Sequence, residues 1–471
     1  MAKIGLVYIS DESQISMGLA YISAVLKQGG HSVVLWDDYY IKEKGIVNEI
    51  IKSDAQIVMF SVHTLAYQRI LEMSKQVKSK RPDIIILFGG WHSVIDPEGM
   101  INEPSIDLVC VGEGEYAALD VANDFDKTGL KNADKIANIW SKKDGIITRN
   151  PSRKLGSLDD LPFPDRDIFN KSSLIDRDGR FYFSTGRGCP HNCTYCCNKK
   201  MVDLYKSCDS PYVRLRSINK CMEEFRTIKE KYNPPQIIFT DEQFLISENR
   251  TKEFCKVYIE NNIKIPFSFM ARVEKITDEV AKALKEAGCT RIFFGIESGN
   301  DELRRKYLNR YMTNEQIINA FDICRKHGIE TCSFNMIGLP FETKKTIRDT
   351  FELNKRCNPD LFQISIVYPF PATEMRDIYK KYDMIDESKD KGRNIFNTYI
   401  LKNTEVSFSY IKHQQIFMQL YFSHYKILSH ISKIIPANLL NQYVIFAQFL
   451  RKKKKTKLVL YKITKLLGSF S

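Results

Sequence analysis

The chain has 471 residues, more than the roughly 100–200 residues of one ordinary domain, so we expect two or three folded units. Its 43% hydrophobic and 11% aromatic residues exclude a disordered or fibrous protein. Six of the charges behind its net charge of +13 lie within residues 451–457. This terminal cluster belongs to no recognisable nucleic-acid-binding module, which makes nucleic acid a weak candidate partner.

The N-terminus and the cysteines both favour a cytoplasmic protein. Residues 1–10 run into a polar segment at Asp11, without the apolar stretch and cleavage site of a signal peptide. Three of the 12 cysteines crowd into residues 189–196, and Cys110 alone lies in the first 180 residues. This spacing favours a metal site in a reducing compartment over a disulfide framework. No apolar run approaches the ~20 residues of a membrane span.

The first 125 residues alternate between apolar segments and helical spacing, which predicts a parallel, doubly wound, Rossmann-like sheet. The strands are expected at 3–9, 32–36, 56–61, 84–88 and 107–111, and helices at 17–28 and 67–78. Ligands of such sheets bind beyond the carboxyl ends of the strands. The candidate residues there are Ser61, His63, Gly89, Gly90, Gly112 and Glu113. For Gly89 and Gly90 a tight turn is an equally good explanation.

Residues 126–175 lack strong periodicity, and the two prolines of the 161–166 segment favour an extended linker. A second alternation follows, and its six units predict a partial, TIM-like (β/α)6 barrel over residues 176–385. Its strands are expected at 181–185, 236–240, 266–270, 291–295, 332–337 and 362–367, with helices at 278–287, 314–327 and 343–356. Residues 386–471 are expected to be helical, including 410–425 and 439–450, and to end in a basic tail.

Cys189, Cys193 and Cys196 follow the first barrel strand with the spacing C-x3-C-x2-C. Thiolates suit iron–sulfur clusters, and three of them in one loop would leave one iron open to another ligand. Two alternatives stay open. Cys197 could be a fourth ligand, or His191 could complete a structural zinc site.

This loop, with Tyr195 before its third cysteine, resembles the cluster motif of the radical S-adenosylmethionine (SAM) superfamily. Residues from about 180 to 375 follow that family's order of elements. The resemblance implies a [4Fe-4S] cluster whose open iron binds the amino and carboxylate groups of SAM. Reductive cleavage of SAM to a 5′-deoxyadenosyl radical is implied as well, with an electron donor of the flavodoxin or ferredoxin type.

Later strand ends match positions that this family uses for SAM. Asp241 and Glu242 could meet the methionine ammonium group, although Asp241 could equally be a helix N-cap. Arg272 could face a carboxylate or make an ordinary surface ion pair. The resemblance further implies nucleoside and adenine contacts from Glu297, Ser298, Ile337, Gly338 and Leu339.

The first 125 residues resemble the cobalamin-binding domain that precedes the barrel in one subgroup of this superfamily, on segments 17–37, 89–98 and 107–119. The Asp-x-His-x-x-Gly motif that gives cobalt a histidine ligand in many cobalamin proteins is absent after the first strand. His63 and His92 lie on other loops, so we expect no protein nitrogen on cobalt. Because both cofactors must reach one substrate, the active site is expected in a cleft between the domains.

The combined resemblance implies a cobalamin-dependent radical SAM methyltransferase that acts on an unactivated carbon of a small-molecule or lipid intermediate. An oxidative cyclase or rearrangement enzyme with the same cofactors is the alternative. A cobalamin and iron–sulfur sensor is the alternative from another class. The basic segment 451–467 could contact an anionic membrane surface, or it could be a solvated, frayed tail.

Overall fold

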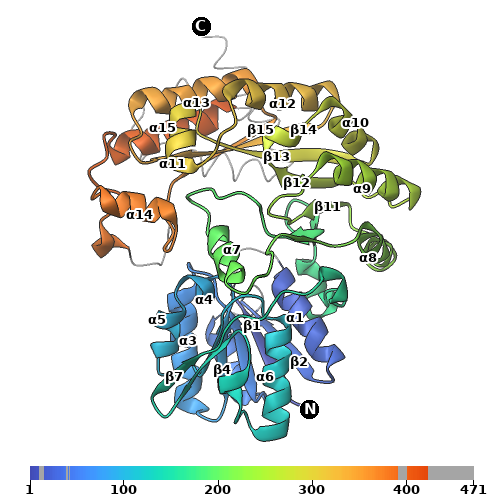
Figure 1. The fold of residues 1–471 in the computed structure, drawn as a ribbon, viewed down its shortest axis with the longest axis vertical. Coiled ribbons are helices and arrows are strands. Elements are labelled where there is room, and N and C mark those ends of the chain that lie inside the picture. The colour runs from blue at the N-terminus through green and yellow to red at the C-terminus, as the bar shows by residue number, and fades with distance from the viewer. Residues whose placement is uncertain (10–14, 39–40, 42, 391–399, 423–471) are drawn as a thin grey trace, which may run out of the picture.

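The computed structural model describes residues 1–9, 15–38, 41, 43–390 and 400–422. Two α/β units lie one above the other along the long axis of the molecule, with the N-terminal unit below in Figure 1. The first contains a seven-stranded sheet and the second a six-stranded sheet. The two alternations of strands and helices in the sequence therefore correspond to two separate sheets, as expected.

The N-terminal sheet has the strand order β2-β1-β3-β4-β5-β6-β7, in which β1 to β5 are parallel. Helices α1 and α6 share one apolar core with the sheet, and α2, α3 and α5 share the other, so both faces are covered. The strands are β1 (Lys3–Tyr8), β2 (Ser32–Asp37), β3 (Ile57–Ser61), β4 (Ile85–Gly89), β5 (Leu108–Cys110), β6 (Ile139–Lys143) and β7 (Ile146–Arg149). The helices are α1 (Met17–Gln28), α2 (Glu43–Lys52), α3 (Tyr67–Lys80), α4 (Trp91–Ile95), α5 (Pro97–Asn102) and α6 (Glu115–Thr128).

Part of the linker that we expected over residues 126–175 is regular structure instead. Strands β6 and β7 form an antiparallel hairpin that joins the sheet through β5. Asp144 and Gly145 make its turn, with φ values of 50° and 79°. An Asp-Gly pair between two short apolar segments is a strong hairpin signal, and it could have been recognised in the sequence. We therefore propose that the N-terminal unit ends near Arg149 and not at residue 125.

The second unit is an open barrel of parallel strands in the order β15-β14-β13-β12-β11-β8, which confirms the partial barrel. Figure 1 shows α10, α12 and α13 along the side of this sheet away from the N-terminal unit. The strands are β8 (Arg180–Phe183), β11 (Gln236–Phe239), β12 (Phe267–Ala271), β13 (Cys289–Glu297), β14 (Glu330–Ile337) and β15 (Leu361–Ile366). The helices are α7 (Asn198–Lys206), α8 (Ile218–Lys231), α9 (Glu248–Glu260), α10 (Asp278–Glu286), α11 (Asp301–Leu308), α12 (Asn314–Lys326), α13 (Lys344–Cys357) and α14 (Glu374–Lys381).

Helix α15 (Phe408–Phe422) packs on β15, the edge strand of the barrel. Gln415 and Gln419 donate hydrogen bonds to the Ile364 carbonyl at 3.1 and 3.3 Å, and the ring centroids of Phe362 and Phe422 are 4.5 Å apart. The helix expected over 410–425 therefore forms up to residue 422. The helix expected over 439–450 and the basic segment 451–467 lie outside the described residues.

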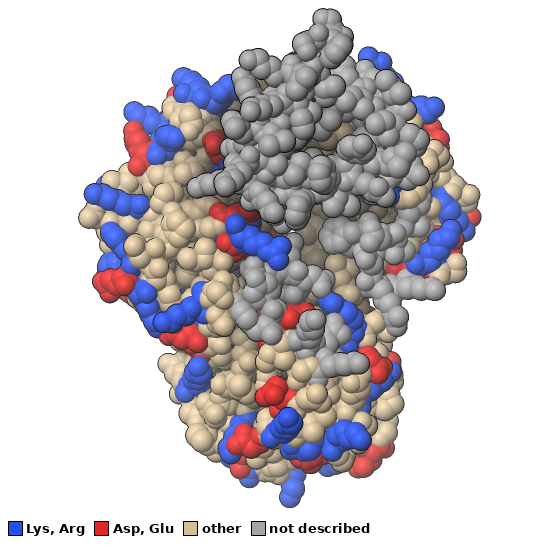
Figure 2. Space-filling view, turned by 180° about the vertical axis from the view of Figure 1, so that it is seen from behind, with Lys and Arg blue, Asp and Glu red and all other residues tan. Residues whose placement is uncertain are grey.

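The described surface carries charges of both signs. Figure 2 shows lysine and arginine side chains interspersed with acidic ones over the visible part of the N-terminal unit. A nucleic-acid-binding protein is expected to carry a basic patch. On the side that Figure 2 shows, the described residues form no such patch. No helix among the described residues has both the length and the apolar character needed to cross a bilayer.

Candidate active site between the two units

The cysteine loop lies between a short strand, β9 (Gly186–Arg187), and α7. Burial, with smaller contributions from the neighbouring thiols of Cys197, Cys193 and Cys189, raises the pKa of the Cys196 thiol to about 12. Such a thiol stays protonated near neutral pH, and a bound metal would deprotonate it. Among the described residues, no three His, Cys, Asp or Glu side chains converge closely enough to share one ion.

Two guanidinium groups lie beside Cys193. Its sulfur is 3.8 Å from Arg272 Nη1 and 3.7 Å from Arg310 Nη1. Arg272 Nε also donates a hydrogen bond to Glu274 at 3.0 Å, and Arg310 Nη1 donates one to the Tyr195 hydroxyl at 3.0 Å. These cations would offset the negative charge of a cluster that the Cys193 sulfur holds. Arg310 lies in the loop after α11, where no strand end indicates its role.

Asp241 and Glu242 hold the chain segment that leads into the cysteine loop. Asp241 accepts hydrogen bonds from the Thr185 hydroxyl at 2.6 Å and from its backbone N–H at 3.0 Å. Glu242 accepts one from the Gly188 N–H at 3.0 Å. The alternative of Asp241 as a helix N-cap is wrong, because Ser247 caps α9. Burial raises the pKa of Asp241 to about 6.

Glu297 lies where the register of β13 against β14 shifts, and its backbone has φ +67°. Its carboxylate accepts a hydrogen bond from the Tyr195 hydroxyl at 2.9 Å, which connects the cysteine motif to the expected nucleoside site. Ser298 is fully buried, and its hydroxyl accepts a hydrogen bond from the Asn300 N–H at 3.2 Å. The Ser298 side chain therefore stabilises the turn into α11.

The turn after β14 is closed by a buried carboxyl group. Glu342 accepts hydrogen bonds from the N–H groups of Gly338 and Leu339 at 2.5 and 3.3 Å. Burial raises the pKa of Glu342 to about 8. The side chains of Ile337 and Leu339 are buried in apolar clusters with C-terminal residues, and Gly338 has φ +87°. The backbone of Gly338 is engaged as well, because its N–H donates to Glu342 and its carbonyl accepts a hydrogen bond from the Tyr379 hydroxyl.

A cavity of about 470 Å³ lies between the two units, as expected. Its volume is in the range of ligand and cofactor sites. All the N-terminal candidates line it, namely Ser61, His63, Gly89, Gly90, Gly112 and Glu113. From the barrel unit it is lined by Ser184, Gly186, Arg187, Met201, Tyr212, Thr240 and Glu242. The strand-end loops of the N-terminal sheet and the segment beside the cysteine loop thus share one space.

Gly90, His63 and His92 of the N-terminal loops differ in their backbone conformation and in their position relative to the cavity. A Cβ atom on Gly90, whose φ is +91°, would lie 2.8 Å from the Val62 backbone, so this turn requires glycine. His63 lines the cavity, and its Nε2 lies 3.0 Å from the Ile9 carbonyl. His92 is buried beside Thr64 and does not line the cavity, and burial lowers its pKa to about 4.

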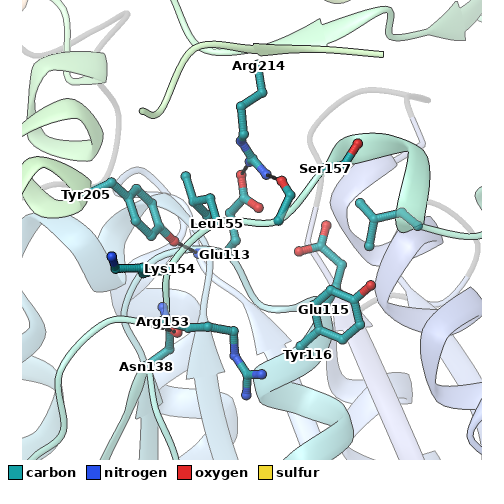
Figure 3. A pocket seen from close by; sticks show the side chains of 12 residues that line it. Glu113, Glu115, Tyr116, Asn138, Arg153, Lys154, Leu155, Ser157, Tyr205 and Arg214 are labelled. Carbon is teal, nitrogen blue, oxygen red and sulfur yellow. Dashed lines mark hydrogen bonds and ion pairs between the residues drawn. The ribbon is translucent and has the colours of Figure 1, made fainter. Parts of the chain in front are cut away.

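Four charged side chains at the boundary of the units were not predicted as a group. Arg187 binds Glu113 at 3.1 Å and Glu115 at 2.6 Å. Figure 3 shows Arg214 reaching from the barrel unit to the same Glu113, and the Tyr205 ring pointing at that loop. Burial alone would raise the pKa of Glu115, but the Arg187 guanidinium lowers it below its usual value. The sequence signals were the position of Glu113 after a predicted strand and that of Arg187 at the start of the cysteine motif.

Two sequence families match the chain in the order of its two units. The B12 binding domain matches residues 11–122, and the Radical SAM superfamily matches residues 183–353. The chain belongs to the radical SAM superfamily and carries a B12-binding domain. Its cofactors are therefore a [4Fe-4S] cluster, SAM and cobalamin. The described residues fit them, because Cys193 lies beside two guanidinium groups, and Gly186, Arg187 and Glu242 next to the cysteine loop line a cavity shared with the B12-binding domain.

Two similar proteins carry the names of different activities, a methyltransferase and a cyclase. An uncharacterized methyltransferase of Pyrococcus horikoshii is 27% identical over 365 residues, which cover 76% of this chain and 77% of that protein. The anaerobic magnesium-protoporphyrin IX monomethyl ester cyclase of Rubrivivax gelatinosus is 25% identical over 387 residues, covering 79% and 67%.

Solved structures share this fold. The cobalamin-dependent radical SAM enzyme OxsB, with aqua-cobalamin and SAM bound, has a TM-score of 0.71 at 19% identity, covering 99% of this chain and 75% of that chain. The radical SAM methyltransferase TsrM from Kitasatospora setae has a TM-score of 0.68 at 17% identity, covering 82% and 77%. These structures support the arrangement of a B12-binding unit followed by a radical SAM barrel.

Proposed function

We propose that this radical SAM protein is a cobalamin-dependent methyltransferase that acts on an unactivated carbon of a small-molecule or lipid intermediate. The observation that carries the proposal is the cavity of about 470 Å³ between the units. A carbon without an acidic proton or a lone pair cannot take a methyl group from SAM directly. It needs a radical and a methyl donor at the same place, and only a shared cavity brings the two cofactors together.

The cysteine loop and its neighbours supply the residues for this chemistry. Cys189, Cys193 and Cys196 would hold the cluster, which when bound supplies the electron that cleaves SAM to a carbon radical. Glu242 lines the cavity and could hold the SAM ammonium group. Asp241 would keep Thr185 in place, and through it the entry to the cysteine loop.

The remaining candidate residues fall on the barrel side of the site. Arg272 is held by Glu274 beside Cys193, where it could also face the SAM carboxylate. Glu297 and the turn at Gly338, which Glu342 holds in shape, would lie against the nucleoside. An external donor of the flavodoxin or ferredoxin type would supply the electron.

The experiment uses the full chain, reconstituted anaerobically with iron, sulfide and cobalamin, and SAM whose methyl group is deuterated. A methyltransferase transfers the labelled methyl group to reduced cobalamin, which mass spectrometry of the extracted cofactor detects. The expected result is labelled methylcobalamin together with 5′-deoxyadenosine under reducing conditions. Formation of 5′-deoxyadenosine with no label in cobalamin would contradict methyl transfer.

That second result would instead support an oxidative cyclase or rearrangement enzyme. The relationship to the Rubrivivax cyclase, at 25% identity over 79% of this chain, favours this as the alternative. Both enzymes would use the same cofactors and the same cavity. Formation of neither product would point to a sensor that uses the cofactors as detectors.

A further inference from the structure

The Gly112–Glu115 loop follows β5 in the B12-binding unit and is attached to the barrel unit at several points. Arg187 divides its guanidinium group between Glu113 and Glu115, at 3.1 and 2.6 Å. Glu115 has only 5% of its surface exposed, so this ion pair lies largely out of solvent. The loop is therefore bound by a residue that comes two positions before Cys189 in the chain.

Two further contacts attach the same loop. Arg214 lies on the short strand β10 (Arg214–Leu215), where it pairs with Arg187 of the antiparallel strand β9. It binds Glu113 and donates to the Gly156 carbonyl at 2.8 Å. The Glu113 N–H donates a hydrogen bond to the Tyr205 hydroxyl at 2.5 Å. Figure 3 shows these two side chains meeting the loop from different sides.

These contacts act on both ends of the cysteine loop. Arg187 lies where the chain enters the loop, and Tyr205 lies on α7, through which the chain leaves it. Arg187, Glu113 and Glu115 also line the cavity between the units. The wall of the cobalamin cavity and the two ends of the cluster loop are thus joined by one group of side chains.

These buried ion pairs of Arg187 and Arg214 with Glu113 and Glu115 fix the relative position of the two units more than they stabilise the fold. Removing charges from water costs about as much free energy as their attraction returns, so a well-packed apolar replacement can be equally stable. The network specifies one arrangement of the two units, because only one position satisfies both carboxylates. A displacement of about 1 Å between reacting groups can slow a reaction about 100-fold.

We propose that Arg187 is a positioning residue that sets the separation between the iron–sulfur cluster and cobalamin, by holding the cysteine loop against the Gly112–Glu115 loop. The inference requires that the protein binds both cofactors, but it does not depend on the proposed methyl transfer. It holds equally for methylation and for cyclisation.

The test measures the cofactors directly, without substrate or SAM. The full chain is reconstituted with both cofactors and reduced, so that cob(II)alamin and the cluster are both paramagnetic. The cluster speeds the relaxation of the cob(II)alamin electron spin, and this effect falls steeply with distance. The variants are Arg187→Met, Arg187→Lys and Glu115→Gln. The matched control is Arg180→Met, because Arg180 also pairs with two carboxylates and its side chain is 20% exposed, against 19% for Arg187.

We expect Arg187→Met to lose the relaxation effect severalfold while iron and cobalamin per chain stay as in the native protein. Glu115→Gln should show a smaller loss, Arg187→Lys should retain most of the effect, and Arg180→Met should retain all of it. Native relaxation in Arg187→Met would overturn the proposal. Loss of iron in both Arg187→Met and Glu115→Gln would also overturn it, since the ion pairs would then form the cluster site itself. If Arg187→Met loses iron but Glu115→Gln does not, the relaxation effect is compared between Glu115→Gln and the native protein. A reduced effect would support the proposal, and a native effect would overturn it.

Discussion

Cys193 differs from the other two cysteines of the motif in its surroundings. It is buried, and two guanidinium groups lie within 3.8 Å of its sulfur. The sequence could suggest Arg272 because it ends a strand, and strand ends of such barrels carry functional residues. Arg310 could not be found in this way, because only the folding of the chain brings the loop after α11 to the cysteines.

At the residue scale, the cluster ligands can be tested one at a time. Changing Cys189, Cys193 or Cys196 to alanine should abolish the [4Fe-4S] absorption and EPR signals of the reconstituted protein, because each removes one of three thiolates. Cys197→Ala should retain them. If Cys197→Ala lost the cluster while one of the other variants kept it, the assignment of ligands would be wrong.

The absence of a protein nitrogen on cobalt is a second prediction at this scale. The EPR spectrum of bound cob(II)alamin should lack nitrogen splitting from a histidine. His92→Ala is the matched control, since His92 does not line the cavity. Splitting that disappears in His63→Ala would contradict the prediction. It would identify His63 as a ligand through the ring nitrogen that does not face the Ile9 carbonyl.

At the scale of elements, the local sequence pattern was sufficient to predict the bounds of single helices and strands. The helix predicted over 17–28 forms as α1 with the same bounds, and the six barrel strands lie within a few residues of their predicted positions. The β6–β7 hairpin was missed because its strands are short and only half apolar, and the Asp144-Gly145 turn was its one clear signal. The Arg187 network was beyond prediction, because its partners are separated by more than 70 residues in the chain.

The turn after β14 predicts a dependence of stability on pH. The folded-state pKa of Glu342 is about 8, above its usual value of 4.5, so the folded state holds this proton more tightly than the unfolded one. Stability from this group is greatest below pH 4.5, falls as the pH rises through about 8, and then levels off. The slope approaches about 1.4 kcal/mol per pH unit.

Glu342→Gln removes the titration while an amide oxygen can still accept from Gly338 and Leu339. Urea unfolding at pH 5 and pH 8 should therefore show a smaller loss of stability in the variant than in the native protein. An equal loss in both would place the titrating group elsewhere, with Asp241 as the next candidate.

At the scale of the whole molecule, the basic segment is predicted to act outside the chemistry. Each lysine or arginine of residues 451–457 could gain about 1 kcal/mol near an anionic bilayer. Removing residues 451–471 should weaken the binding to anionic vesicles and its dependence on salt. Cluster content and SAM cleavage without substrate should stay near native levels. Unchanged vesicle binding, or loss of the cluster, would contradict a membrane-contacting role.

The contact of α15 with β15 has a consequence for association between molecules. An exposed edge strand can recruit a strand from another chain through its free backbone groups. In this protein the Ile364 carbonyl already accepts hydrogen bonds from Gln415 and Gln419, and Phe422 of the helix packs on Phe362 of the strand. Edge-to-edge addition at β15 is thereby blocked, so that copies of the barrel cannot join there into a continuous sheet while α15 is docked.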